Sequence, residues 1–173
     1  MKFYSKGYTF WIMPKGRVYN SFNNLIKKLA DENNAPVFEP HITLLGDIEL
    51  PELEMIKKTQ QLVQSQKPFP VTLRQIGYQD FHFRALFVKL EVTDPLQALH
   101  NRAKEIFGMQ GIPSYMPHLS LLYGNISQEV KNKIIAEIGV DQTAHFEIES
   151  IHLVKGGKVE EWQIVKEFPF KSV

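Results

Sequence analysis

The sequence contains no cysteine and no long run of apolar residues. Of its 173 residues, 43% are hydrophobic and 23% are charged. The lack of cysteine excludes disulfide bonds, thiolate metal ligands and a cysteine nucleophile. Near the N-terminus, the apolar run from Tyr8 to Pro14 is too short for a signal-peptide core, and no stretch approaches the length that spans a membrane. We therefore expect a cytoplasmic protein with no membrane partner.

The sequence also has little net charge, with a formal value of +1 at pH 7. Proteins that follow long nucleic acids usually carry a broad basic surface. The small net charge argues against a long nucleic-acid duplex as a partner, but it allows a local cationic pocket for one phosphate. The chain length predicts one domain over residues 1–173, built from two lobes that share a core.

Helical and strand patterns alternate along the whole chain. Apolar residues at helical spacing predict helices over 17–33, 52–66, 95–107 and 128–138. Strands are predicted over 8–13, 40–46, 71–77, 85–92 and 117–124, followed by a hairpin of 146–154 with 162–168 across 155–158. A change of phase predicts a bulge near Ser150. Pairs of strands separate the helices, which favours an α+β fold with mainly antiparallel sheets.

Two segments repeat one pattern. Residues 39–46 read Glu-Pro-His-Ile-Thr-Leu-Leu-Gly, and residues 116–124 read Met-Pro-His-Leu-Ser-Leu-Leu-Tyr-Gly. One match to the shared six positions has a chance on the order of one in a million per position, given average residue usage. Two copies in one chain therefore indicate an internal duplication. We expect two pseudo-symmetric lobes around a central cleft, with the helices on the outside.

The repeat places reactive groups on one face of each strand. Alternate side chains of a strand share a face, so His41 lies beside Thr43, and His118 lies beside Ser120. Imidazole titrates near neutral pH, so one ring can take a proton from water while the other gives one to a departing sugar oxygen. The hydroxyls can donate hydrogen bonds to phosphate oxygens. The repeat predicts phosphoryl transfer catalysed by these four residues, with no metal required.

The two His-x-Thr/Ser-x motifs, 77 residues apart, resemble those of the 2H phosphoesterase superfamily. The resemblance covers nearly the whole chain. It is greatest to cyclic phosphodiesterases that open 2′,3′-cyclic nucleotides or ADP-ribose cyclic phosphate, and then to bacterial RNA 2′,3′-cyclic phosphodiesterases. It implies a bilobal α+β fold with a cleft between two antiparallel sheets, and catalytic roles for the same four residues without a cofactor. It also implies substrate contacts from Trp11 and Tyr123, although no tyrosine in the first motif mirrors Tyr123.

Other candidate residues carry two interpretations each. Trp11 and Tyr123 can belong to the core or stack on a base. Phe83 and Arg84 precede a predicted strand, where Arg84 can bind phosphate through two guanidinium nitrogens or simply face solvent. The remaining histidines are interpreted as structural: His82, His100, His145 and His152.

The leading hypothesis is a monomeric hydrolase that opens a cyclic phosphate on a small nucleotide or an RNA terminus. The same groups serve the reverse reaction, so a 2′-5′ RNA ligase or phosphodiesterase stays open. A non-catalytic module that binds RNA ends or nucleotides is the alternative from another class, and two intact motifs speak against it. A zinc site on the histidines is disfavoured, because zinc hydrolases usually present three protein ligands and neither Glu39 nor Asp47 is repeated. Pseudo-symmetry leaves the acid and base exchangeable, with a weak preference for His118 as the base.

Overall fold

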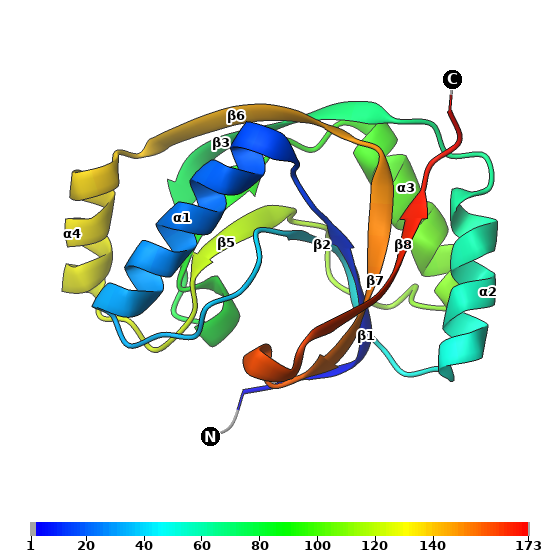
Figure 1. Ribbon diagram of the computed structural model, residues 1–173, viewed down its shortest axis with the longest axis horizontal. Coiled ribbons are helices and arrows are strands. Elements are labelled where there is room, and N and C mark those ends of the chain that lie inside the picture. The colour runs from blue at the N-terminus through cyan, green and yellow to red at the C-terminus, as the bar shows by residue number, and fades with distance from the viewer. Residues whose placement is uncertain (1–2, 173) are drawn as a thin grey trace.

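The computed structural model describes residues 3–172 and confirms the α+β class (Figure 1). Within these residues, the α-helices are α1 (Gly16–Glu32), α2 (Glu52–Val63), α3 (Asp94–Phe107) and α4 (Gln128–Ile138). The strands are β1 (Ser5–Ile12), β2 (Ile42–Ile48), β3 (Phe69–Gly77), β4 (Leu86–Leu90), β5 (His118–Leu122), β6 (Asp141–Ile148), β7 (Ser150–Gly157) and β8 (Gln163–Pro169). Two short 3-10 helices, η1 (His82–Arg84) and η2 (Val159–Glu161), precede β4 and β8.

All of these strands belong to one antiparallel sheet with the order β6-β3-β4-β5-β2-β1-β7-β8. The sheet divides into two four-stranded halves that meet at β5 and β2. At this junction the described ladder consists of one residue pair, Ile42 with Leu119. The two antiparallel sheets expected from the sequence are thus present as halves of a single sheet. The two halves join because the motif strands β2 and β5 meet edge to edge. Their backbone N–H and C=O groups can pair there instead of being buried without partners.

The helices are exchanged between the two lobes. Helix α1 follows β1 in the chain, but it packs against β5 and β6 in the other half of the sheet. Helix α3 follows β4 and packs against β2. Figure 1 shows α1 and α4 on one side of the molecule and α2 and α3 on the other. Each lobe therefore buries its apolar side chains against helices that come from both parts of the chain.

The apolar core lies beneath the motif strands. Side chains at the positions between the motif residues are fully buried, as strand alternation predicts: Ile42, Leu44, Leu119 and Leu121. Burial of each such side chain contributes about 1.5–3 kcal/mol to stability. The polar face of each motif is thus supported by a rigid apolar layer on its other side.

The C-terminal prediction needs one correction. The sequence predicts a single strand over 146–154 with a bulge near Ser150, but the chain forms two strands there. Strand β6 pairs with β3 at the edge of one half, whereas β7 lies between β1 and β8 in the other half. The phase change between Ile148 and Ile151 marks the passage between halves, because each side chain is buried in a different half of the sheet. The hairpin with 162–168 is confirmed as β7–β8, with η2 in its connection.

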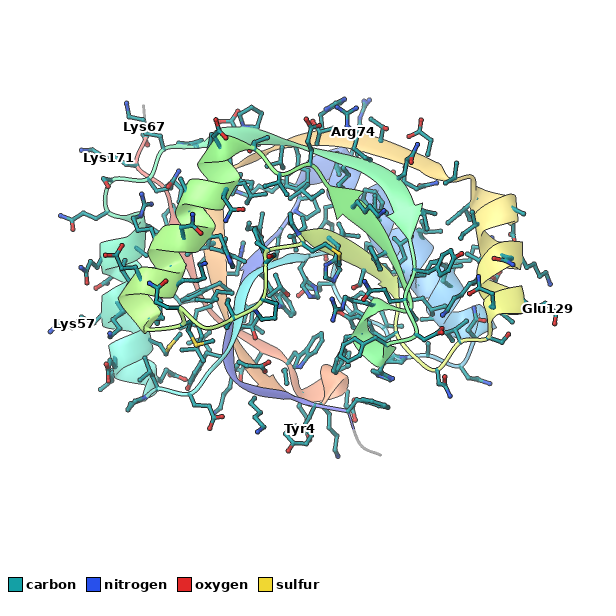
Figure 2. All side chains as sticks on the ribbon, turned by 180° about the vertical axis from the view of Figure 1, so that it is seen from behind. Tyr4, Lys57, Lys67, Arg74, Glu129 and Lys171 are labelled. Carbon is teal, nitrogen blue, oxygen red and sulfur yellow. The ribbon has the colours of Figure 1, made fainter. Side chains whose placement is uncertain are left out.

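Among residues 3–172, no helix combines the length and the apolar character needed to cross a bilayer. Charged side chains lie at the periphery instead, as Figure 2 shows for Lys57, Arg74 and Glu129.

Candidate active site

A cavity of about 510 Å³ is lined by residues from both halves of the sheet. All four motif residues line it: His41, Thr43, His118 and Ser120. His41 immediately precedes β2, and His118 begins β5, so the central junction of the sheet brings the two motifs together (Figure 1). The structure therefore places in one cavity the groups that the repeat predicted to share a cleft.

The two histidines are oriented by equivalent hydrogen bonds. Nδ1 of His41 lies 2.7 Å from the carbonyl oxygen of Glu39, and Nδ1 of His118 lies 2.9 Å from that of Met116. A carbonyl oxygen can only accept, so Nδ1 of each ring carries a proton. In the neutral ring, Nε2 is then the nitrogen that remains available to a ligand. The duplicated sequence thus produces a duplicated ring orientation and tautomer.

Burial distinguishes the two rings. His41 is 5% exposed and stacks on Trp11, with ring centroids 3.9 Å apart. Burial lowers the pKa of His41 to about 4, although its bond to the Glu39 carbonyl acts in the opposite direction. His118 is half-buried, and burial lowers its pKa from the ordinary value. Its bond to the Met116 carbonyl acts in the opposite direction, and the nearby charge of Arg84 adds to the lowering. Both rings are therefore mainly neutral at pH 7 in the free protein.

The hydroxyl groups of Ser120 and Thr43 lie in different environments. Ser120 is buried, and its Oγ donates a hydrogen bond of 3.0 Å to the carbonyl of Phe83. To donate to a phosphate oxygen, this hydroxyl must rotate and release that carbonyl. Thr43 is half-buried and lies opposite Trp11 across the β1–β2 ladder, on the cavity face.

The backbone beneath Thr43 is held from behind by two aromatic rings. The hydroxyl of Tyr115 donates to the carbonyl of Thr43 at 3.0 Å, and Nδ1 of His100 donates to the carbonyl of Leu44 at 2.8 Å. The two rings stack with their centroids 3.9 Å apart. His100 thus supports the first motif strand and does not line the cavity.

Phe83 and Arg84 also line the cavity, at the end of the loop that leads into β4. This loop is held by Lys131, whose side chain is 1% exposed. Its ammonium donates to the carbonyl of Gln79 at 3.1 Å and to a carboxylate oxygen of Asp80 at 2.7 Å. Arg84 lines the cavity close enough to His118 for its charge to act on that ring, and its guanidinium can attract an anion there.

Aromatic rings line the cavity around His41. Trp11 and Tyr123 are both buried at the cavity wall, where Trp11 stacks on His41 and Tyr123 stacks on Phe38. Sequence reasoning missed Trp162, whose ring centroid lies 5.9 Å from those of both His41 and Tyr123. Its indole N–H donates to Oγ of Ser5 at 2.9 Å. Trp162 follows η2 in the connection before β8, and no local pattern shows that this connection folds back over the site.

Other cavity residues were also missed. Strand alternation from Trp11 puts Thr9 on the same face, so Thr9 could have been found from the sequence. Alternation from Thr43 likewise reaches Asp47, which also lines the cavity. The rest depend on tertiary structure: Tyr4, Ser5, Gly46, Phe81, Val154 and Gly156. Across residues 3–172, no three side chains of His, Asp or Glu lie close enough together to form a metal site.

Comparison with known proteins assigns the family. The sequence model of the 2′-5′ RNA ligase superfamily matches residues 20–160, which include both motifs. The chain belongs to this superfamily. It is the 2H phosphoesterase group that the motifs resemble, so the resemblance found in the sequence is confirmed. Membership supports phosphoesterase activity of the cyclic phosphodiesterase type.

Relatives of this 2′-5′ RNA ligase superfamily member agree in sequence and in fold. The cyclic phosphodiesterase of Arabidopsis thaliana is 28% identical over 124 residues, which cover 72% of this chain and 68% of the relative. LigT of Escherichia coli in complex with 3′-AMP superposes with a TM-score of 0.67 at 13% identity, covering 96% of this chain and 99% of LigT. A Thermus thermophilus protein superposes with a TM-score of 0.66 at 17% identity, over 96% and 98% of the two chains. At these identities, the two structures show a shared fold.

Proposed function

We propose that this protein opens a 2′,3′-cyclic phosphate on a ribonucleotide or an RNA end, without a metal, by acid–base catalysis at His41 and His118. The proposal rests on the two equivalently oriented imidazoles. Each ring is fixed through Nδ1 to the carbonyl two residues before it, and both rings line the same cavity. Two rings held alike, with Nε2 available on each, suit a reaction that needs one proton acceptor and one proton donor.

The proposed reaction is the hydrolysis of one phosphate ester bond. A water oxygen attacks phosphorus, and the bond from phosphorus to one ribose oxygen breaks. One imidazole accepts the proton of the water, and the other, as imidazolium, donates a proton to the departing ribose oxygen. The products are a phosphomonoester and a free ribose hydroxyl. Thr43, Ser120 and Arg84 stabilise the negative charge on the non-bridging oxygens.

The comparisons supply independent support for a nucleotide-sized substrate. The Arabidopsis thaliana relative is named a cyclic phosphodiesterase, and LigT has been crystallised with 3′-AMP and with phosphate. The cavity volume of about 510 Å³ is within the range of pockets that bind small molecules, roughly 300–1,000 Å³. Trp11, Tyr123 and Phe83 offer aromatic contacts for the base or ribose.

The test uses 2′,3′-cyclic AMP with excess EDTA and identifies the products by phosphorus NMR. We expect the wild-type protein to form one phosphomonoester, and His41→Ala and His118→Ala each to abolish turnover. His145→Ala is the matched control, because His145 is an exposed histidine outside the cavity and should be dispensable. Turnover that EDTA stops would refute the metal-free mechanism. Tight nucleotide binding without any turnover would favour the non-catalytic binding module.

The second candidate is a reaction on 2′-5′ linkages, favoured by the superfamily match itself. The reaction is again the cleavage of one phosphate ester bond, here in a 2′-5′ linkage between two nucleotides. A 2′-5′-linked diadenylate in the same assay separates the two candidates, because it yields a nucleoside and a nucleotide only if that bond is attacked.

A further inference from the structure

Along the first motif segment, the cavity continues beyond the motif residues in one direction only. On β2 it is lined by Thr43 and then by Gly46 and Asp47, whereas no residue before His41 lines it on that segment. On the antiparallel neighbour β1, the lining runs from Trp11 back to Thr9 and Ser5, and on β7 it includes Val154 and Gly156. A substrate whose phosphate binds at the histidines therefore has room for its remaining atoms along β1 and β2, toward Asp47.

Asp47 faces this space in phase with His41 and Thr43, although the sheet between them is irregular. The β1–β2 register shifts on both sides of Phe10, opposite Leu45. Leu44 and Leu45 are consecutive and both buried, so the alternation of β2 breaks there, and Gly46 lines the cavity in place of Leu45. The second register shift restores the phase, so Asp47 lines the cavity as well. Asp47 has φ of 55°, a left-handed conformation that aspartate and asparagine adopt more readily than most residues.

Gly46 keeps the floor of the cavity open between the two ends. A Cβ atom at this position would lie 3.3 Å from Oγ1 of Thr9 and 3.6 Å from Cγ2 of Thr43. A side chain there would fill the space between the motif threonine and the far end of the cavity. The glycine lets a bound molecule lie close to the backbone as it passes from one end to the other.

The carboxylate of Asp47 is positioned to accept one more hydrogen bond. One of its oxygens, Oδ1, accepts from the backbone N–H of Lys6 at 3.0 Å, which orients the group. Within residues 3–172 this is the only hydrogen bond assigned to the Asp47 side chain, and no ion pair involves it. Asp47 lies four residues from Thr43, at most about 13 Å along the strand. An ionised carboxylate accepts hydrogen bonds and repels anions. This end of the cavity therefore suits a neutral hydrogen-bond donor rather than a second phosphate.

Substrate chemistry limits which donor can bind there. In a 2′,3′-cyclic nucleotide, both ribose oxygens at these positions belong to the phosphate ring and donate nothing. The donors that remain far from the phosphate are the 5′-hydroxyl, the amino groups of the base and, in uracil and guanine, one ring N–H. Cytosine has an amino group where uracil has a carbonyl oxygen, and a carboxylate accepts from the cytosine amine. A carboxylate placed to accept from that amine would face the O4 carbonyl of uracil, and only a shift of the base toward its N3–H would restore a hydrogen bond.

We propose that Asp47 is a specificity-determining residue that binds the exocyclic amino group of the base and selects cytosine over uracil. This inference rests on the proposed function, because it takes the phosphate to bind at the two histidines. Tyr4 and Phe81 also line the cavity and offer aromatic surface for the base. Tyr4, labelled in Figure 2 beside the start of β1, is 57% exposed.

The experiment measures binding, so that it is independent of turnover. Dissociation constants for 3′-CMP and 3′-UMP are determined by calorimetry with the wild type, Asp47→Asn and Glu49→Gln. The asparagine retains an oxygen for the Lys6 N–H and tolerates the left-handed backbone, so the fold should be kept. Glu49→Gln changes the net charge equally, and Glu49 is an exposed residue outside the cavity.

We expect the wild type and Glu49→Gln to bind 3′-CMP about tenfold more tightly than 3′-UMP, as the loss of a hydrogen bond to a charged group implies. In Asp47→Asn the preference should disappear. Equal binding of the two nucleotides by the wild type, or no binding of either, would overturn the inference. An equal loss for both nucleotides in Asp47→Asn would also overturn it, since the carboxylate would then bind a shared group such as the 5′-hydroxyl. The proposed function fails separately, by absence of cyclic phosphate turnover.

Discussion

At the scale of single residues, the proposed chemistry depends on which nitrogen of each imidazole holds a proton. The carbonyls of Glu39 and Met116 keep a proton on Nδ1 of His41 and His118, which leaves Nε2 of each ring to exchange protons with a substrate. Burial keeps both rings mainly neutral in the free protein, because it lowers both pKa values. A bound phosphate has the opposite effect, since a nearby anion favours the imidazolium.

These pKa shifts predict a bell-shaped pH dependence of kcat/KM with its maximum on the acid side of 6.5. One limb reflects His41, with a pKa of about 4, and the other reflects His118, whose pKa is below its ordinary value. The position of the bell does not depend on which ring is the base. The kcat profile should lie at higher pH, because the bound anion raises both pKa values. Initial rates from pH 4 to 9 provide the measurement, and a kcat/KM maximum above pH 7 would contradict the prediction.

At the scale of elements, the loop before β4 connects helix α4 to the chemistry. Lys131 of α4 is buried and holds the backbone of Gln79, and the loop then carries Phe83 and Arg84 to the cavity. The carbonyl of Phe83 accepts from Ser120 in β5, so the loop also orients a motif residue. A buried ammonium with these partners is therefore expected to position the site without touching the substrate.

Lys131→Met tests this positioning role. Methionine keeps much of the side-chain volume but loses the bonds to Gln79 and Asp80, so the loop should be held less firmly. We expect KM for a cyclic nucleotide to rise about tenfold, the equivalent of one hydrogen bond to a charged group, with a smaller change in kcat. Lys133→Met is the control, because Lys133 is an exposed residue of the same helix. Unchanged KM in a folded Lys131→Met protein would show that the loop holds its place without the ammonium.

At the scale of the whole molecule, the exchanged helices make the two lobes interdependent. Since α1 packs on β5 and α3 packs on β2, neither lobe can bury its core while the other is unfolded. We therefore propose that the described residues, 3–172, form one cooperative domain. Buried His41, which serves the proposed chemistry, also lowers the stability of this domain in acid. Unfolding exposes its imidazole, which can then take up a proton.

We predict a loss of stability between pH 7 and pH 4 that depends on His41. Its folded pKa of about 4 lies below the ordinary value of 6.5, so the unfolded chain binds more protons in this range and stability falls as pH falls. The loss from this one ring is about 3 kcal/mol at pH 4, given 1.36 kcal/mol for each pKa unit. Urea unfolding at both pH values checks it, with His41→Gln as the variant that cannot titrate. An equal loss in wild type and His41→Gln would contradict the assignment.

Much of the site could be predicted from the sequence, because the motif that forms it is a short local pattern that occurs twice. Alternation in β2 and β5 correctly put each motif hydroxyl on the same face as its histidine, with Ile42 and Leu119 in the core. Trp162 and Gly46 could not be found this way. Trp162 reaches the cavity through a connection that folds back over β7, and Gly46 lines it only because of a register shift that local alternation does not reveal. Asp47 is in phase with Thr43 and could have been found by alternation, as Thr9 could from Trp11.

The sequence by itself determined the α+β class, the duplicated motif and the faces on which the two histidines and two hydroxyls lie, because periodicity and proline boundaries are properties of neighbouring residues. Tertiary structure alone decided that the two halves form one sheet, that β6 and β7 separate at Ser150, and that His41 is more deeply buried than His118. The physical reason is that strand pairing and desolvation depend on residues distant in the chain. Two nearly identical motifs thus acquire different environments from the packing around them.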